Sequence, residues 1–339
     1  MFEKLKELCI LNGASGDEKN VRDNIIKCID ENSEYHTDNL GNLIVFKKGR
    51  KTPKNKIMLA AHMDEVGLIA TSVRSDGTVT VDEVGGVSPS VVIGRQVSVG
   101  KDGLTGVVGS RAVHKLSADD RKKAPEMSGL YVDFGAADRE EALKYISPGD
   151  YIYFSSEYTE YGEGYVRCKA IDDRYGCCAL VEMINSEPEY DAYYVFTVQE
   201  ELGCRGAKTA AFAVEPDIAI VMETTTASDI PGVSGNKRVC ELGKGAVVSY
   251  MDRSTMYDRE LYKIAFEAAA EMGIPCQTKT LIAGGNDSGA IHVSGCGVRT
   301  IAVSAPCRYL HSPSCVVKKS DLEACYKMAQ ELLSRTAQL

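Results

Sequence analysis

Side chains that can bind metal ions follow several apolar segments of the sequence, at the points where predicted strands end. They are His62 and Asp64 after residues 57–61, Glu200 and Glu201 after 194–199, Glu223 after 218–222, and His311 shortly after 300–306. A further pair, Asp172 and Asp173, lies where a loop is expected to enter a helix. In open α/β sheets the ligand crevice lies beyond the carboxyl ends of the strands, so separate pieces of chain would meet at one edge. We therefore predict a single site formed by histidines and carboxylates.

These side-chain types indicate a catalytic metal site rather than a structural one. Imidazoles and carboxylates without a set of cysteines suit Zn²⁺, Co²⁺ or Mn²⁺. A metal pair needs a bridging carboxylate, and in two-metal hydrolases the ions lie about 3.5–4 Å apart. Bound water then loses its proton near neutral pH, and a nearby carboxylate can accept it. The sequence has no G-x-S-x-G elbow, no H-E-x-x-H helix and no Walker-type loop.

Each of these groups also has an ordinary structural explanation. A single histidine after a strand, such as His62, is more often structural than a ligand, although a carboxylate two residues later can orient a metal-bound ring. Glu200 and Glu201 are surface charge unless their strand ends there, because neighbours within a strand point to opposite faces. Asp172 and Asp173 could simply cap a helix. It is the combination of all five segments that favours a site.

The other histidines and the cysteines near these motifs are expected to be structural. His36 and His114 lack a comparable context, and His292 lies in an apolar stretch, so we expect a satisfied, buried ring there. Three cysteines, Cys177, Cys204 and Cys307, lie near the motifs. Redox sensitivity is conceivable for them, but packing as small apolar side chains is favoured.

The elements that must position these groups divide the chain into two kinds of region. Helical spacing predicts helices over 2–11, 17–31, 173–186, 257–272 and 320–337, and apolar runs predict strands at 42–46, 56–61, 192–198, 217–222 and 299–305. Asp17 is expected to cap the second helix. Residues 66–164 hold 14 of the 31 glycines and read as short strands separated by turns, with one helical candidate near 138–146.

We therefore predict an α/β fold with a mainly parallel sheet. Residues 1–65 and 165–339 would form one discontinuous catalytic domain, and 66–164 would form an inserted, small β-rich domain.

Bulk composition excludes several classes of protein. The net charge of −9 over 339 residues argues against nucleic acid as a partner. No run of about 18 apolar residues occurs, and the charged N-terminal segment resembles neither a signal peptide nor an anchor, so no membrane partner is expected. Twelve cysteines, none at C-x-x-C spacing, favour free thiols in a reducing compartment. We expect a cytoplasmic protein.

Five sequence motifs stand out: AHMDEVG at 61–67, AIDDRYGC at 170–177, TVQEELGCRGA at 197–207, GGNDSGAI at 284–291 and PCRYLHSP at 306–313. Together they resemble family M42 metallo-aminopeptidases, which include tetrahedral, TET-type enzymes, glutamyl aminopeptidases and proteins once labelled endoglucanase M. The motifs occur in the family's order and spacing over nearly the whole chain. The resemblance implies a di-metal aminopeptidase acting on peptides with a free N-terminus. It also implies a PDZ-like inserted dimerisation domain and homo-oligomers from dimers to dodecamers.

The resemblance also implies a role for each matching residue. His62, Asp172, Glu201, Glu223 and His311 would bind two divalent ions per subunit, Zn²⁺ or Co²⁺ foremost and Mn²⁺ as a further choice. Asp172 would bridge the ions and Asp173 would follow it in a strained turn. Glu200 would be the general base, and Asp64 would orient the ring of His62.

Position 223 departs from the family, which usually has Asp there. Glu can still bind through one oxygen, but its extra methylene group would move the metal or change the rotamer, so an altered metal preference is a reasonable hypothesis.

Two other functions compete with this reading. An endo-1,4-glucanase needs a carboxylate pair beside a sugar cleft that is usually lined by aromatic platforms, and this chain has no tryptophan. A metal-binding scaffold with a decayed site would not be expected to keep the full ligand set. The preferred first residue of the substrate, the native metal and the oligomer size do not follow from the sequence.

Overall fold

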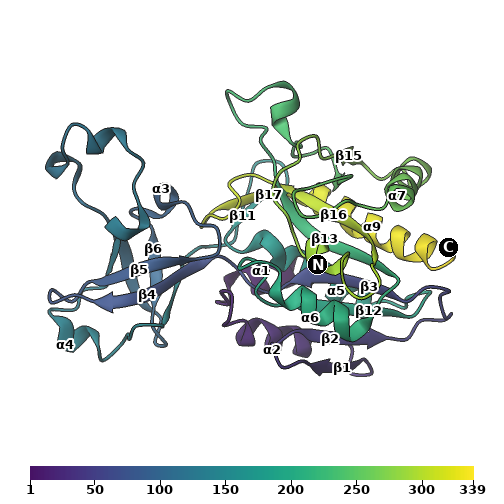
Figure 1. Cartoon of the computed structure of the whole chain (residues 1–339), viewed down its shortest axis with the longest axis horizontal. Coiled ribbons are helices and arrows are strands. Elements are labelled where there is room, and N and C mark those ends of the chain that lie inside the picture. The colour runs from purple at the N-terminus through teal and green to yellow at the C-terminus, as the bar shows by residue number, and fades with distance from the viewer.

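A central sheet between two layers of helices forms the larger part of the molecule (Figure 1). The computed structural model describes residues 1–339, apart from the side chain of Asn236. In order across the sheet, the strands are β1 (Glu34–Thr37), β2 (Leu43–Lys47), β12 (Ala192–Thr197), β3 (Ile57–His62), β13 (Ile218–Thr226), β16 (Arg299–Cys307), β14 (Ala246–Val248) and β15 (Cys276–Thr278). Its centre, from β12 to β16, is parallel, whereas β1, β2 and β14 pair antiparallel with their inner neighbours.

Helices cover both faces of this sheet with apolar side chains. One face packs against α1 (Phe2–Ile10), α2 (Lys19–Cys28), α5 (Ile171–Asn185), α7 (Arg259–Met272) and α9 (Lys319–Thr336). The opposite face packs against α6 (Arg205–Val214) and α8 (Ser288–Ile291). Strands β3 and β13 are buried along nearly their whole length. This is the burial expected for parallel strands with helices on both sides, and it confirms the predicted α/β class.

The glycine-rich segment folds into a closed barrel beside the sheet (Figure 1). The barrel strands, in order around the barrel, are β4 (Gly67–Val73), β5 (Val79–Val84), β8 (Tyr131–Asp133), β7 (Leu104–Gly109), β6 (Gln96–Val99) and β9 (Tyr151–Phe154). Its core is separate and rich in valine. The β-rich character is confirmed, whereas the predicted boundaries at 66 and 164, the PDZ-like likeness and the dimerisation role stay predictions.

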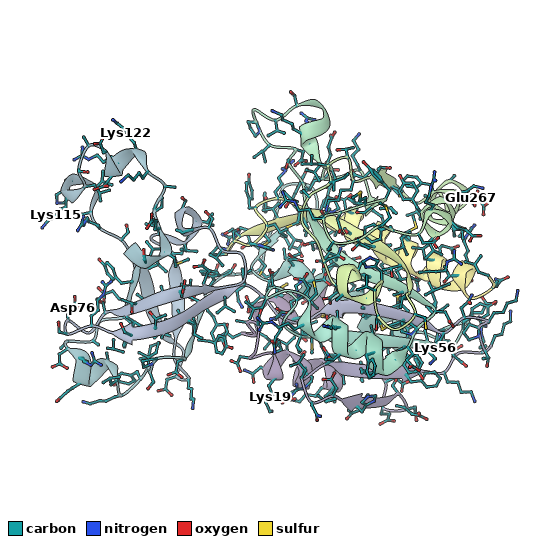
Figure 2. The ribbon with its side chains drawn as sticks, viewed as in Figure 1. Lys19, Lys56, Asp76, Lys115, Lys122 and Glu267 are labelled. Carbon is teal, nitrogen blue, oxygen red and sulfur yellow. The ribbon has the colours of Figure 1, made fainter. Side chains whose placement is uncertain are left out.

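Short elements complete the barrel region and the loops. They are α3 (Pro89–Val92), α4 (Arg139–Ala142), and the 3₁₀ turns η1 (Val113–Lys115), η2 (Asp120–Lys122), η3 (Met127–Gly129) and η4 (Gly235–Arg238). A small sheet of β10 (Thr159–Tyr161), β11 (Tyr165–Cys168) and β17 (Cys315–Lys318) lies where the chain returns to the main sheet. Figure 2 shows the 111–126 loop, with Lys115 and Lys122, projecting from the barrel.

The prediction that Asp17 caps the second helix is wrong. Helix α2 begins at Lys19, and its N-cap residue is Glu18. Instead, the carboxylate of Asp17 accepts a hydrogen bond from the hydroxyl of Tyr153 in the barrel. Tyr151, next but one in the same strand, donates to the carbonyl of Ser15 at 2.9 Å. The loop before α2 therefore fastens the barrel to the α/β layers.

A buried ion-pair cluster joins the places where the chain leaves for the barrel and returns from it. The ammonium of Lys169 contacts both carboxylate oxygens of Glu65, at 2.6 and 2.9 Å. Arg174 lies 3.5 Å from the same carboxylate and donates to backbone carbonyls, among them those of Leu8 and Met63. Every charge in this cluster has a partner.

Candidate metal centre

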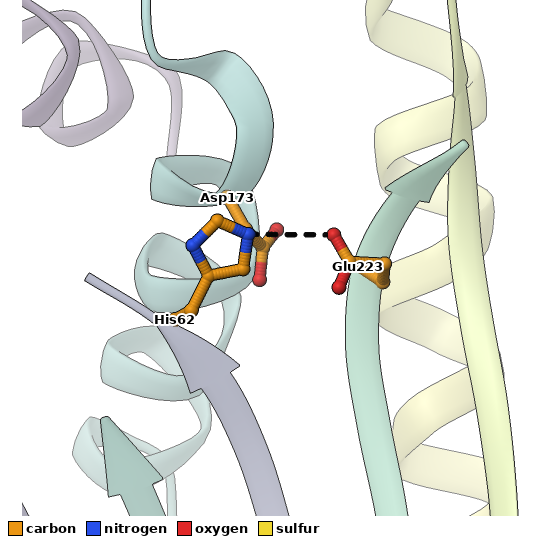
Figure 3. A group of neighbouring side chains, drawn as sticks. All are labelled: His62, Asp173 and Glu223. Carbon is orange, nitrogen blue, oxygen red and sulfur yellow. Dashed lines mark ion pairs between the residues drawn. The ribbon is translucent and has the colours of Figure 1, made fainter. Parts of the chain in front are cut away.

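Side chains from β3, α5 and β13 meet at the carboxyl edge of the parallel strands. The Nε2 atom of His62 lies 3.5 Å from Oδ1 of Asp172 and 3.5 Å from Oε1 of Glu223. Asp173, beside Asp172 at the start of α5, points toward the same imidazole (Figure 3). Both aspartates have non-helical backbone angles, which turns their carboxylates toward the strand ends.

A second group forms on the other side of Asp172. The Nε2 atom of His311 lies 3.5 Å from Oδ2 of Asp172 and 3.4 Å from Oε2 of Glu201. The carboxylate of Asp172 thus presents one oxygen to each histidine. The other ring nitrogen of His311 hydrogen bonds with the carbonyl of Gly86 at 3.0 Å, so a barrel loop holds this ring in place.

Asp64 links the His62 ring to the segment that carries the two glutamates. Its Oδ1 lies 3.4 Å from Nδ1 of His62 and accepts from the backbone N–H of Glu200 at 3.0 Å. Its Oδ2 accepts from the N–H of Glu201 at 3.1 Å and from the hydroxyl of Ser15 at 2.6 Å. Each carboxylate oxygen therefore has a donor, which suits a group that orients others.

The glutamate pair sits on a tight turn between β12 and α6. Gln199, just before the pair, has a φ of 54°, in the left-handed region that is disfavoured for residues other than glycine. Helix α6 begins very close to the end of the strand, because a Cβ on Gly206 would lie 2.4 Å from the carbonyl oxygen of Val198. The turn lets both glutamates face the same cavity, where a continuing strand would direct them apart.

The site lines a cavity of about 760 Å³, and more carboxylates than basic side chains line its wall. Its wall includes Asp172, Glu200, Glu201, Glu223 and His311. Burial and the charge of Asp172 raise the pKa of Glu223 to about 8, and burial is also the main cause that raises the pKa of Glu201 to about 7. Burial lowers the pKa of His62, but neighbouring carboxylates outweigh this and raise it above its ordinary value.

This donor set fits divalent cations. Among the described residues, Asp172 Oδ1 and Asp173 Oδ2 are buried without a hydrogen-bond partner. Groups formed by His62 with Asp172 and Glu201, and by His62 with Asp173 and Glu223, have ligand atoms within 4.8 Å of one another. A buried carboxylate oxygen without a donor is unfavourable unless a cation compensates it.

The structure brings together every residue that the sequence singled out for the site. His62, Glu201, Glu223 and His311 gather around Asp172, Asp64 contacts the ring of His62, and Glu200 lines the same cavity. Their roles as ligands or base stay predictions. His36 and His114 are exposed. His292 is half-buried rather than buried as expected, and its Nδ1 lies 3.0 Å from the Ser288 carbonyl.

Ser15, Thr197 and Asp287 were not foreseen as neighbours of the site. Ser15 contacts Asp64 from a loop far away in sequence, and Thr197 donates to Asp287 beneath the glutamate pair. The NDSG motif at 286–289 was the only signal that could have pointed to Asp287.

Among the described residues, none of the helices is both long and apolar enough to cross a bilayer. The cysteines are free thiols throughout the described structure.

Comparison with known proteins places this geometry in a family. A model of the M42 glutamyl aminopeptidase family matches residues 41–328. A relative from Acetivibrio thermocellus is 39% identical over 339 residues, which is 98% of this chain and 98% of that protein. The structure of an aminopeptidase from the archaeon Desulfurococcus kamchatkensis superposes with a TM-score of 0.93 at 33% identity, covering 98% of this chain and 94% of that one.

A third comparison concerns assembly. The TET1 peptidase of Pyrococcus horikoshii, described as assembling into a tetrahedron or a large octahedral shell, matches with a TM-score of 0.85 at 33% identity over 98% of both chains.

Proposed function

We propose that this chain, which belongs to the M42 glutamyl aminopeptidase family, is a metal-dependent aminopeptidase that removes the first residue from peptides with a free N-terminus. One observation carries the proposal: the carboxylate of Asp172 lies between His62 and His311, with a buried oxygen that lacks a hydrogen bond among the described residues. Such a carboxylate suits a bridge between two cations.

Two sets of ligands follow from the distances. His62 and Glu223 would hold one divalent ion with Asp172, and Glu201 and His311 would hold the other with the same carboxylate. Zn²⁺ or Co²⁺ suits the mixture of imidazole and carboxylate best, and Mn²⁺ is compatible with it. When bound, the ions would polarise the scissile carbonyl and lower the pKa of the attacking water.

The protein's own groups then have separate tasks. Glu200 lines the cavity beside the ligand Glu201, and its carboxylate accepts the proton of the attacking water and passes it to the leaving amine. Asp64 keeps the ring of His62 and the backbone of both glutamates in place. The cavity has room for the first residue of a peptide beside these groups.

The decisive experiment separates proton transfer from metal binding. Glu200→Gln should keep both ions, as measured by elemental analysis, and lose about 10²–10⁴-fold in kcat. Glu201→Ala should instead lose bound metal. Glu267→Gln, on the distant helix α7 (Figure 2), is the matched control and should behave as the parent does.

Several outcomes would contradict the proposal. A Glu200→Gln protein with near-normal turnover would remove the base assignment. A fully metal-loaded preparation that is inert toward all unblocked aminoacyl substrates would favour the decayed scaffold. Turnover of cellulose that survives EDTA would favour the glucanase. Activity toward aminoacyl substrates should be measured with Zn²⁺, Co²⁺ and Mn²⁺ in turn. Glu223→Asp should shift the preference among these ions if the length of the side chain matters.

The oligomeric state is a second part of the proposal. The barrel would serve as a dimerisation domain, and 1–65 with 165–339 would form the catalytic domain. The assembly described for the related TET1 peptidase supports a homo-oligomer here. Light scattering on the purified chain tests this, and a monomer at micromolar concentration would contradict it.

A further inference from the structure

A second group of metal-type ligands lies at the base of the same cavity, apart from the bridging aspartate. Glu200, Cys204 and Asp287 each offer one ligand atom, and these atoms lie within 4.8 Å of one another. The thiol of Cys204 lies 3.4 Å from Oε1 of Glu200. Cys204 is the N-cap residue of α6, and both it and Glu200 line the cavity, whereas Asp287 is buried behind them.

One buried oxygen of this group lacks a hydrogen-bond partner among the described residues. The side chain of Asp287 is buried, with only 1% of the residue exposed. Its Oδ2 accepts from the hydroxyl of Thr197 at 2.5 Å, but its Oδ1 has no hydrogen-bond partner among the described residues. The described structure also gives none of the three side chains an ion pair with Lys, Arg or His within 4.0 Å.

The donor types distinguish this group from the proposed metal pair. The pair is surrounded by imidazole nitrogens and carboxylate oxygens, whereas this group adds a sulfur atom. Zn²⁺ and Co²⁺ accept thiolate together with carboxylate ligands. Binding would replace the S–H bond of Cys204 with a sulfur–metal bond and release one proton to solvent, without a change in oxidation state. An ion here would be repelled by two ions already bound in the same cavity, so this site should fill after the pair.

We propose that Glu200, Cys204 and Asp287 form a third metal site, which binds Zn²⁺ or Co²⁺ at higher concentration and inhibits the enzyme. The inhibition rests on the proposed function, because an ion held by Glu200 prevents this carboxylate from accepting a proton. Metal binding at this site does not rest on the proposed function, since binding requires only the three donors.

Cobalt spectroscopy tests the binding directly. The intact protein is titrated with Co²⁺ past two equivalents while near-ultraviolet absorption and bound metal are measured. Only a site with sulfur gives a thiolate-to-cobalt charge-transfer band, so the band should grow with the third equivalent. Cys204→Ser should keep two equivalents and lose the band. Cys296→Ser, which removes an exposed thiol outside the cavity, is the matched control. It should keep the third equivalent and the charge-transfer band.

Inhibition is measured on the same proteins with excess Zn²⁺. The parent and Cys296→Ser should lose activity as Zn²⁺ rises, and the inhibitory concentration should increase at least about tenfold in Cys204→Ser. Asp287→Asn is a second variant that weakens the third equivalent through a different donor. If Cys204→Ser does not fold, this variant still tests the site.

The outcomes separate the two proposals. Absence of a third equivalent, or a charge-transfer band that persists in Cys204→Ser, overturns the third site and leaves the peptidase untouched. A third equivalent with the band, together with full activity of Glu200→Gln, keeps the site and removes the assigned base.

Discussion

Two clusters of buried charges lie next to each other in this protein, and they differ in whether their charged groups have partners within the chain. Lys169 and Arg174 share the carboxylate of Glu65, and their remaining hydrogen bonds go to backbone carbonyls. The neighbouring cluster around Asp172 has an excess of carboxylates, and two of its buried oxygens lack hydrogen bonds in the described structure. The two share adjacent residues, since Glu65 follows Asp64 and Arg174 follows Asp173.

The difference teaches how to read a buried charge. A buried cluster whose charges all have partners within the chain contributes to structure. A buried cluster with an excess of carboxylates is instead a candidate site for a cation. The same substitution, Glu to Gln, should therefore have different consequences in the two places.

The largest effect is expected for Glu65→Gln. This change leaves the buried ammonium of Lys169 without its counter-charge, because its other hydrogen bond goes to the neutral carbonyl of Leu11. Loss of one member of a buried ion pair should lower the free energy of unfolding by about 3–5 kcal/mol. Urea unfolding with and without metal measures this, and a loss below about 1 kcal/mol would show that the cluster is not structural.

Glu223→Gln should change the metal-free protein far less. The pKa of Glu223 is raised to about 8, so this carboxyl group is mostly protonated at neutral pH without metal, and Gln resembles the protonated form. The variant should instead forfeit the stabilisation that bound Co²⁺ provides, about 2.7 kcal/mol at one hundred times Kd. Thermal unfolding of both proteins, with EDTA and with Co²⁺, checks this. Equal stabilisation by Co²⁺ would contradict the ligand role.

The pH dependence of the metal-free protein should follow from the same excess of carboxylates. A carboxyl group whose pKa is raised in the folded state contributes stability that is lost as pH rises from its ordinary pKa to the raised one. For Glu223 this window runs from 4.5 to about 8. Stability should therefore fall across it, on the order of 1 kcal/mol for each pH unit, and the slope should be smaller in Glu223→Gln. A flat profile in EDTA would contradict this.

The smallest effect, of opposite sign, belongs to an ion pair at the protein surface. Asp258 caps α7 and accepts from Arg299 at 2.8 Å, and these hydrogen bonds lower its pKa. Its contribution is present above its ordinary pKa of 3.8 and is lost as pH falls below that value. Because the pair is partly exposed, we expect less than about 1 kcal/mol. Asp258→Asn should reduce the acid-side slope and leave the slope above pH 4.5 unchanged.

The sequence predicted the parallel strands and the main ligand segments because these are local patterns. Strands β3 and β13 contain apolar runs, and His62 and Glu223 come directly after those runs, although both strands extend to include them. Strands β14 and β15 escaped prediction because three residues carry no readable period. Helix α6 was also missed, since it begins immediately after the glutamate turn without a separate start signal.

Contacts between distant segments could not be foreseen. Ser15 reaches Asp64 across 49 positions, and Lys169 reaches Glu65 across 104. Asp17 looked like a helix cap because the preference of Asp for such positions is local. Its actual partner, Tyr153, lies in the barrel and becomes a neighbour only through the tertiary fold.

The ion pair between Glu65 and Lys169 has a consequence for how this architecture can change. It holds the exit and the return of the barrel segment together, while hydrogen bonds of Tyr151, Tyr153 and Gly86 attach the same segment to the α/β layers at other points. Because Gly86 contacts the ring of His311, a change in the length of this segment would reach the proposed metal site as well as the barrel.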